Sequence, residues 1–246
     1  MSNCVVTASR LIGKNIRSLS VRWAEKPPKP GQFVNIRADG AFLRRPISVC
    51  DYFDGTLTVV FEVRGEGTRA LAQCVPGQLL DVLGPLGQGF QLPKSGDVLL
   101  VGGGAGSAPM LCAAKALSGR ASVILGFRGA EHVVLDREIA DAAREVYITT
   151  NDGSRGFKGF PTLLMPELLK KPYAAVFVCG PRPLMKAVAQ IAKDFGIPCQ
   201  VSLEERMACG VGACLVCVCK TRENGAETMR RICSDGPVFD AAEVIW

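Results

Sequence analysis

Four cysteines in the C-terminal part of the chain have a spacing that fits metal chemistry. Cys209, Cys214 and Cys217 follow the pattern C-x4-C-x2-C, and Cys233 comes after fifteen intervening residues. This is the ligand spacing of plant-type [2Fe–2S] sites, where four thiolates hold two irons. Glycine and alanine lie between these cysteines, so the backbone can approach the inorganic sulfides closely. The pattern predicts a [2Fe–2S] cluster bound by these four cysteines.

Two alternatives stay open at this point. Cys219 follows Cys217 by two residues, so in an extended segment both side chains would point to one face, and either could be the ligand. Pairing with Cys214 in a C-x2-C unit favours Cys217, and we interpret Cys219 as a packed neighbour. Structural zinc also accepts four cysteines, but its first pair is normally matched by a second close pair, which this segment lacks.

A second candidate site lies in the segment LRRPISV, residues 43–49. Proline fixes its own φ angle and favours an extended predecessor, so Pro46 presents Arg45 from a rigid strand. A guanidinium there can hold a pyrophosphate through two hydrogen bonds, and Ser48 can bond to the edge of a flavin ring. Taken alone, the segment is equally compatible with a surface strand that carries solvated arginines.

A glycine-rich turn strengthens the flavin interpretation. In VFEVRGEGTRALA, residues 60–72, a strand ends at Gly65-Glu66-Gly67-Thr68 and a short helix follows. Free amides at a helix start, with Thr68 as a possible cap, favour an anion. Two elements suited to phosphate on one domain predict a dinucleotide flavin, FAD rather than FMN.

A third set of loops is typical of nicotinamide-binding domains. In residues 98–111 the glycines of a strand–loop–helix unit match the dinucleotide fingerprint at Gly102 and Gly104, but its last position is Ser107. Two further loops, 149–154 and 179–185, follow later strands. In open parallel sheets, ligands bind beyond the carboxyl ends of the strands, where such loops gather. Cys179 would then lie near a nicotinamide ring, or it is simply a buried small residue.

Three regions are expected to position these groups. Residues 1–94 predict an antiparallel β-barrel, because short strands alternate with turn residues. Residues 95–200 alternate buried strands with helices, which predicts a doubly wound parallel sheet. Residues 201–246 contain too few apolar residues for a core of their own, so something other than burial is expected to order them. The candidate barrel strands are VVTASRLI, SLSVRW, GQFVNIRA, ISVCDY and GTLTVVFEVRG.

Composition and charge exclude several other functions. The net charge of +6 is spread without long basic runs or basic–aromatic clusters, which argues against nucleic acid as a partner. Neither a signal peptide nor an apolar stretch of about 20 residues is evident, so we expect a cytoplasmic protein without membrane association, in which cysteines stay reduced. His132 is the only histidine, and no hydrolase triad can be assembled around it.

Together, these motifs resemble the ferredoxin reductase superfamily and, over almost the whole chain, the electron-transfer subunits of type B dihydroorotate dehydrogenases. The segments that carry the resemblance are RRPIS (44–48), GEGT (65–68), DVLGPLGQGF (81–90), GGGAGSAP (102–109), CGPRPLM (179–185), MACGVGACLVCVC (207–219) and ICSDGPVF (232–239).

The resemblance implies an electron-transfer role in pyrimidine biosynthesis. An FMN-containing catalytic subunit would oxidise dihydroorotate to orotate, and electrons would pass through the [2Fe–2S] cluster and FAD of this chain to NAD. It also implies a heterotetramer with two copies of each subunit. Two alternatives are kept: an NAD(P)-linked reductase subunit of a sulfide-, sulfite- or hydrogen-metabolising complex, and a zinc-ordered docking module without electron transfer.

The resemblance also implies which residues bind the cofactors, and it implies no catalytic acid or base. One position departs from the family pattern, because Glu62 stands where arginine is common and a carboxylate cannot pair with phosphate. Arg64 is expected to replace it, leaving Glu62 a backbone contact. The implied FAD contacts are Arg45, Pro46, Ile47, Ser48, Val60, Phe61, Glu62, Gly67 and Thr68, and the implied cluster ligands are Cys209, Cys214, Cys217 and Cys233.

Overall fold

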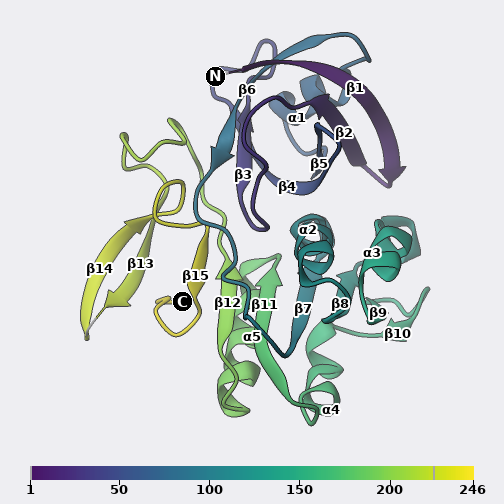
Figure 1. Cartoon of the computed structure of the whole chain (residues 1–246), viewed down its shortest axis with the longest axis vertical. Helices are drawn as coiled ribbons and strands as arrows, with labels where there is room; N and C mark the ends of the chain where they lie inside the picture. Colours follow the sequence, from purple (N-terminus) through teal and green to yellow (C-terminus); the bar gives the residue numbers. More distant parts are fainter. Residues whose placement is uncertain (1, 224) are drawn as a thin grey trace.

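The computed structural model describes residues 2–223 and 225–246. A barrel, an α/β domain and a small hairpin region lie against one another (Figure 1). The barrel occupies one end of the molecule, and the sheet of the α/β domain lies below it. The hairpin stands beside the sheet edge that is farthest from helix α3 (Asp136–Ala142).

The N-terminal region is a closed antiparallel barrel, as predicted. Its order is β1-β2-β5-β4-β3-β6, and the short helix α1 (Glu66–Ala72) follows β5. The sixth strand, β6, was not among the predicted strands, because its sequence LLDVLGPL is interrupted by glycine and proline. The strands are β1 (Ser2–Gly13), β2 (Ile16–Arg22), β3 (Phe33–Ile36), β4 (Arg45–Phe53), β5 (Thr56–Glu62) and β6 (Leu79–Leu86).

Strand β3 separates two environments through the alternation of its side chains. Val34 and Ile36 belong to the barrel core, whereas Phe33 belongs to the core of the α/β domain and the C-terminal region. Successive side chains of a strand point to opposite faces, so Asn35 shares the outer face with Phe33. This outer face is where the barrel meets the rest of the molecule.

The central region is the expected doubly wound α/β domain. Its seven-stranded sheet has the order β10-β9-β8-β7-β11-β12-β15, and only β15 runs antiparallel to its neighbour. Every residue of β8 is buried, which explains the continuous apolar run of this strand. The strands are β7 (Asp97–Gly103), β8 (Ala121–Phe127), β9 (Glu145–Thr150), β10 (Phe157–Lys158), β11 (Tyr173–Cys179), β12 (Cys199–Ser202) and β15 (Val238–Asp240).

The helices cover the sheet on both faces, and α2 also packs against β4 of the barrel. Lys115 on α2 donates to Asp51 on β4 at 2.6 Å across this contact. His132 lies in a short 3-10 turn, and helix α3 begins after it at Asp136. The helical segments are η1 (Gly104–Ser107), α2 (Ala108–Leu117), η2 (Ala130–His132), α3, η3 (Pro161–Leu163), α4 (Met165–Leu168) and α5 (Arg182–Asp194).

The C-terminal region consists of a hairpin, β13 (Val218–Glu223) and β14 (Ala226–Arg231), followed by β15. The expectation that something other than burial must order it was wrong in part. Cys217, Ile232 and Cys233 are buried in one hydrophobic cluster with residues of the α/β domain. The C-terminal region therefore shares the hydrophobic core of the α/β domain. The boundary proposed at residue 200 falls inside β12.

Within the described part of the chain, none of the helices combines the length and the apolar character needed to cross a lipid bilayer.

Candidate functional site

Arg45 and Gly67, both predicted to contact FAD, lie against each other in the barrel. Arg45 begins β4, and its Nη1 donates to the carbonyl oxygen of Leu43 at 2.8 Å. A Cβ atom on Gly67 would lie 2.0 Å from Nε of Arg45, so a larger residue here would displace the guanidinium. No carboxylate of the described residues forms an ion pair with Arg45. An uncompensated guanidinium beside free helix amides suits a phosphate.

Thr68 has a different role from the one predicted. The helix cap is Gly65, and Thr68 is the third residue of α1. Its hydroxyl oxygen accepts hydrogen bonds from the amides of Arg64 at 2.9 Å and Gly65 at 3.1 Å. Thr68 thus fixes the turn that presents Gly67 to Arg45.

The barrel ladder is interrupted between β4 and β5, next to these residues. The first half of β4, Arg45–Ser48, pairs with β3, whereas pairing with β5 begins only at Val49, which lies opposite Val59. In the described pairing, the edge of residues 60–62 that faces β4 therefore has no partner strand, which leaves backbone groups for a flat ring to bond.

The side chains of β5 are largely committed to packing. Val60 and Phe61 are buried in two different hydrophobic clusters, so only their backbone could meet a ligand. Arg64 donates to Glu62 from Nε at 2.8 Å and from Nη2 at 2.5 Å. The two residues whose roles were weighed against each other are therefore partners in an ion pair.

The strand ends of the α/β domain meet through glycines. A Cβ on Gly106 would lie 2.4 Å from the carbonyl oxygen of Cys179, and one on Gly180 would lie 3.1 Å from Cα of Gly103. The loops after β7 and β11 are thus in direct contact, as the sequence predicts for a dinucleotide site. The hydroxyl of Ser107 is fully buried there and has no partner among the described residues.

Cys179 is buried, and burial raises the pKa of its thiol to about 12. It is therefore a neutral thiol at neutral pH, which suits packing near a ring and does not suit a nucleophile.

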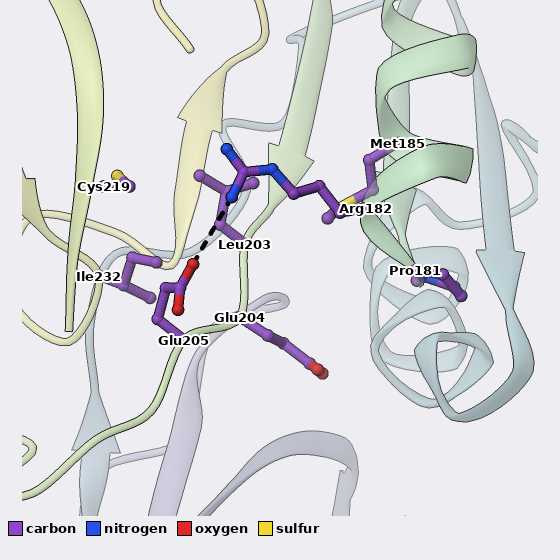
Figure 2. Close-up of a pocket in the computed structure, with 9 residues that line it drawn as sticks. Pro181, Arg182, Met185, Leu203, Glu204, Glu205, Cys219 and Ile232 are labelled. Carbon is purple, nitrogen blue, oxygen red and sulfur yellow. Dashed lines mark ion pairs between the residues drawn. The ribbon is translucent and has the colours of Figure 1, made fainter. Parts of the chain in front are cut away.

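Beside this loop, a cavity of about 150 Å³ separates the α/β domain from the hairpin (Figure 2). Arg182 reaches across it to Glu205, with 3.6 Å between Nη1 and Oε1, whereas Glu204 points the other way. No motif in the sequence predicts this cavity, which is lined by Gly180, Pro181, Arg182, Met185, Leu203, Glu204, Glu205, Cys219 and Ile232.

The predicted cluster ligands approach one another in two pairs. The Cys209 thiol interacts with that of Cys214, and the amide of Cys233 donates to Sγ of Cys217 at 3.4 Å. Cys233 also accepts from the amide of Gly212 at 3.1 Å, which connects the pairs. Burial and the neighbouring Cys217 thiol raise the pKa of Cys233 to about 12, whereas the amide of Val211 helps lower that of Cys209 to about 6.

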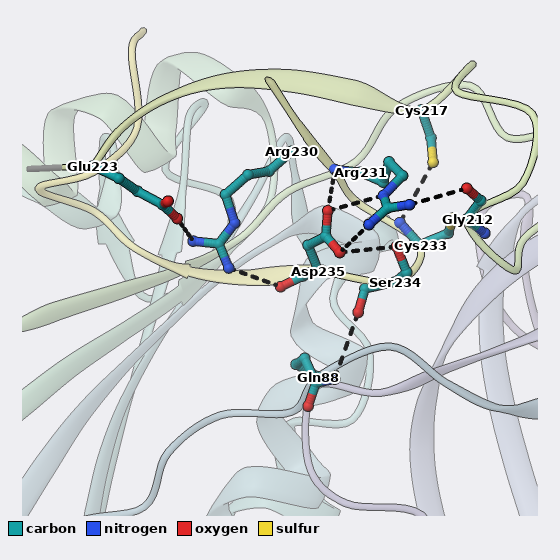
Figure 3. A network of polar contacts seen from close by, with 9 residues as sticks. All are labelled: Gln88, Gly212, Cys217, Glu223, Arg230, Arg231, Cys233, Ser234 and Asp235. Carbon is teal, nitrogen blue, oxygen red and sulfur yellow. Dashed lines mark hydrogen bonds and ion pairs between the residues drawn. The ribbon is translucent and has the colours of Figure 1, made fainter. Parts of the chain in front are cut away.

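An ion pair braces the loop that carries these cysteines (Figure 3). Arg231 donates to both carboxylate oxygens of Asp235 at 3.1 Å, and its Nη1 donates to the carbonyl oxygen of Gly212 at 3.3 Å. Arg231 holds the pKa of Asp235 at about 2, so the carboxylate is charged at neutral pH. The network ties the turn of Cys233 to the glycines between Cys209 and Cys214.

The paired arrangement suits a site with two irons. The thiols of Cys209 and Cys214 interact, and the amide of Cys233 donates to the thiol of Cys217. Zinc needs four donors around one point, whereas a [2Fe–2S] cluster takes two thiolates at each of two irons. The amides of Val211, Gly212 and Cys233 already donate to thiols of the set, as cluster sulfurs require.

Cys219 is held apart from these pairs. It lies on β13 opposite Arg230 and lines the cavity of Figure 2. Cys217, by contrast, directly precedes β13 and contacts the turn of Cys233. The Cys217 thiol therefore lies at the turn of Cys233 and the Cys219 thiol at the cavity, although the two residues are only two positions apart.

The comparisons with known proteins bear on the whole chain. Residues 204–245 match the family model described as the iron-sulfur cluster binding domain of dihydroorotate dehydrogenase B. The chain is 42% identical over 243 residues to the dihydroorotate dehydrogenase B (NAD(+)) electron transfer subunit of Caldanaerobacter subterraneus subsp. tengcongensis, covering 98% of this chain and 97% of the relative. It is 41% identical to the subunit of the same name from Clostridium perfringens, covering 87% and 86%.

Solved structures show the same architecture. A chain of the NADH-dependent reduced ferredoxin-NADP oxidoreductase structure superposes with a TM-score of 0.89 at 31% identity, covering 100% of this chain and 91% of that one. Phthalate dioxygenase reductase superposes with a TM-score of 0.65 at 19% identity, covering 94% and 77%, and shows the fold alone.

Proposed function

The chain belongs to the family of dihydroorotate dehydrogenase B (NAD(+)) electron transfer subunits, and from this membership we propose the route by which its residues connect a catalytic partner to NAD. The partner is an FMN-containing subunit that oxidises dihydroorotate to orotate in pyrimidine biosynthesis. When bound, the [2Fe–2S] cluster would carry single electrons, and FAD would collect two of them together with a proton from solvent for transfer to NAD as a hydride.

The barrel supplies the FAD site. Arg45 and the first turn of α1, at Gly67 and Thr68, hold the pyrophosphate. Ser48 and the unpaired backbone edge of residues 60–62 bond to the ring, and Pro46 and Ile47 give it a rigid wall. Glu62 contributes only backbone, because its carboxylate is engaged by Arg64.

The α/β domain supplies the NAD site at the strand ends. The glycines of the β7 loop let a pyrophosphate approach the backbone, and the Ser107 hydroxyl is available to bond it. The neutral, buried thiol of Cys179 packs beside the nicotinamide without reacting with it. None of these residues has to donate or remove a proton, because a hydride carries both electrons directly.

The C-terminal region supplies the cluster site, and Cys209, Cys214, Cys217 and Cys233 would hold the cluster through their thiolates. Amides of the loop donate to the ligand sulfurs, which stabilises the reduced, more negative cluster. Arg231 and Asp235 keep the two halves of the ligand set together.

Apolar side chains on the cluster loop support a docking surface for the catalytic subunit. Val211, Leu215 and Val216 are each more than half exposed. Exposed apolar groups beside an electron-transfer centre suit a protein partner, because the interface excludes water and shortens the path. We propose a cytoplasmic heterotetramer of two chains of each kind, and eleven free cysteines are consistent with a reducing compartment.

One observation carries this proposal: the two cysteine pairs lie in the segment that matches the iron–sulfur family model. The test is anaerobic purification of the chain together with its catalytic subunit. We expect flavin absorption, an electron paramagnetic resonance (EPR) signal of a reduced [2Fe–2S] cluster, and iron and acid-labile sulfide in equal amounts. Adding dihydroorotate should reduce NAD.

A colourless protein that contains zinc would contradict the proposal. An intact cluster and flavin without NAD reduction by dihydroorotate would instead favour a reductase subunit of another complex, a candidate supported by the 0.89 TM-score to the ferredoxin-NADP oxidoreductase chain.

A further inference from the structure

Asn35 is a polar side chain buried without a partner. It lies on β3 of the barrel with 0% of its surface exposed. Neither Nδ2 nor Oδ1 forms a hydrogen bond with any described residue. A buried carboxamide that forgoes its hydrogen bonds to water destabilises the fold unless something else bonds to it. The side chain therefore indicates a ligand that the polypeptide does not provide.

The place of Asn35 narrows the choice of ligand. Its side chain is on the outer face of β3, and a Cβ atom on Gly210 would lie only 2.5 Å from Nδ2. Gly210 is buried, has a φ of +73°, and directly follows Cys209. The carboxamide thus faces the cluster loop from the barrel. Its nearest strand partner on the other side is Pro46, in the segment proposed to bind FAD.

Two apolar side chains near Asn35 offer no partner to a bound water. The position of that Cβ is also only 3.7 Å from Cδ1 of Leu86, and Phe33 shares the same strand face. A buried water needs two to four polar partners, and these apolar neighbours offer none. The loop of the cluster ligands remains as the source of a partner.

We propose that the carboxamide of Asn35 donates a hydrogen bond to an inorganic sulfide of the cluster. This inference rests on the proposed function, because it requires the cluster. Cluster sulfurs are acceptors, and Nδ2 offers two N–H donors. The contact makes Asn35 a positioning residue that joins the cluster loop to the strand beside the FAD segment.

The proposal predicts a change in the cluster's redox equilibrium. Reduction adds negative charge to the cluster, and a donor to its sulfur stabilises that charge, so Asn35 raises the reduction potential. Replacing Asn35 by leucine keeps similar bulk and removes the donors. The ratio of reduced to oxidised cluster at a fixed solution potential should fall about tenfold, which is about 59 mV for one electron.

The test uses the assembled complex with its cofactors. An EPR-monitored redox titration compares wild type, Asn35→Leu and the control Ser20→Ala, which removes the 2.8 Å hydrogen bond to Thr58 elsewhere in the barrel. A second measurement labels asparagine with 15N and records pulsed EPR of the reduced cluster. An asparagine nitrogen coupling should be present in wild type and in Ser20→Ala, and absent in Asn35→Leu.

Three results would overturn the inference: no asparagine coupling in wild type, a coupling that survives in Asn35→Leu, or equal potential shifts in Asn35→Leu and Ser20→Ala. If Asn35→Leu does not fold, the wild-type coupling decides alone. Lack of a [2Fe–2S] signal in wild type would instead defeat the proposed function itself, so the two failures are distinguishable.

Discussion

The barrel and the cluster loop are built in opposite ways. The residues proposed to hold FAD stand on paired strands and one helical turn, and their geometry is fixed by backbone hydrogen bonds and by the contact of Arg45 with Gly67. The loop between β12 and β13 contains no regular element, and Gly210, Gly212 and Leu215 have positive φ angles in it. The flavin site is preorganised, whereas the cluster site depends on what it binds.

This difference has a physical reason. The pyrophosphate and the flavin ring of FAD can bind to groups that the barrel strands already hold in place. A cluster needs all four cysteines as thiolates, which repel one another unless a metal compensates their charge, so this ligand set is stable only with the metal bound. The left-handed conformation of Leu215 adds roughly 1–2 kcal/mol of strain. Loss of cofactor should therefore unfold the loop and spare the barrel.

The largest expected effect is the loss of one cluster ligand. Cys214→Ser should abolish the [2Fe–2S] EPR signal and leave FAD absorption unchanged, because the barrel does not need the loop. Cys219→Ser is the matched control and should retain the cluster. Iron and sulfide analysis of both variants measures this. Cluster loss in Cys219→Ser with retention in Cys217→Ser would reverse the proposed assignment.

The next largest effect is expected at the proposed FAD site. Arg45→Ala should weaken FAD binding about 100-fold, roughly 3 kcal/mol, because a charge-assisted contact to pyrophosphate is lost. The cluster should remain. Fluorescence titration of FAD measures the change, with Arg22→Ala on β2 as the control. Equal weakening in both variants would show a general effect of charge.

A smaller effect is expected from the brace of the loop. Asp235→Asn should speed iron loss to a chelator about tenfold, since it removes the ion pair with Arg231, whereas Glu227→Gln in the exposed pair with Arg222 should not. The depressed pKa of Asp235, about 2, means that its stabilisation is present above the ordinary carboxyl range and is lost as pH falls toward 2. Equal rates of iron loss in Asp235→Asn and Glu227→Gln would show that the ion pair of Asp235 with Arg231 does not stabilise the cluster loop.

The smallest effect should come from one methyl group. Gly67→Ala places a Cβ against the Arg45 guanidinium, whose flexible end can move, so FAD affinity should fall about fivefold, about 1 kcal/mol. Gly65→Ala is the control, because its Cβ would meet nothing within 4 Å. Measured FAD dissociation constants that rank the two variants in reverse would contradict the proposed phosphate contact.

The sequence predicts those parts of the fold that are determined locally. The strand Ala121–Phe127 lies in the region predicted to alternate buried strands with helices, because its continuous apolar run leaves little choice. Strand β6 was missed because its edges are half exposed and its glycine and proline are typical of turns. The burial that stabilises the C-terminal region was also not predicted, because its buried side chains pack against strands that are distant in the sequence.

The candidate site likewise contains residues that belong to sequence motifs and residues whose role depends on tertiary contacts. Motifs of adjacent residues, such as Arg45-Pro46-Ile47-Ser48 and the cysteine run, mark candidate sites in the sequence. Asn35 is not marked in this way, because a single asparagine in a strand has no pattern, and its meaning comes only from burial against Gly210. The same holds for Arg231 and Asp235, whose contact with Gly212 depends on how the loop closes.

The central claim is that electrons move between NAD and the cluster through FAD within this chain. The direct measurement is EPR of the isolated, cofactor-loaded chain after anaerobic addition of NADH, compared with Arg45→Ala depleted of FAD. The account predicts a reduced [2Fe–2S] signal in wild type, and in the variant a signal only with dithionite. Reduction of the cluster by NADH without FAD, or no reduction in the loaded wild type, would contradict it.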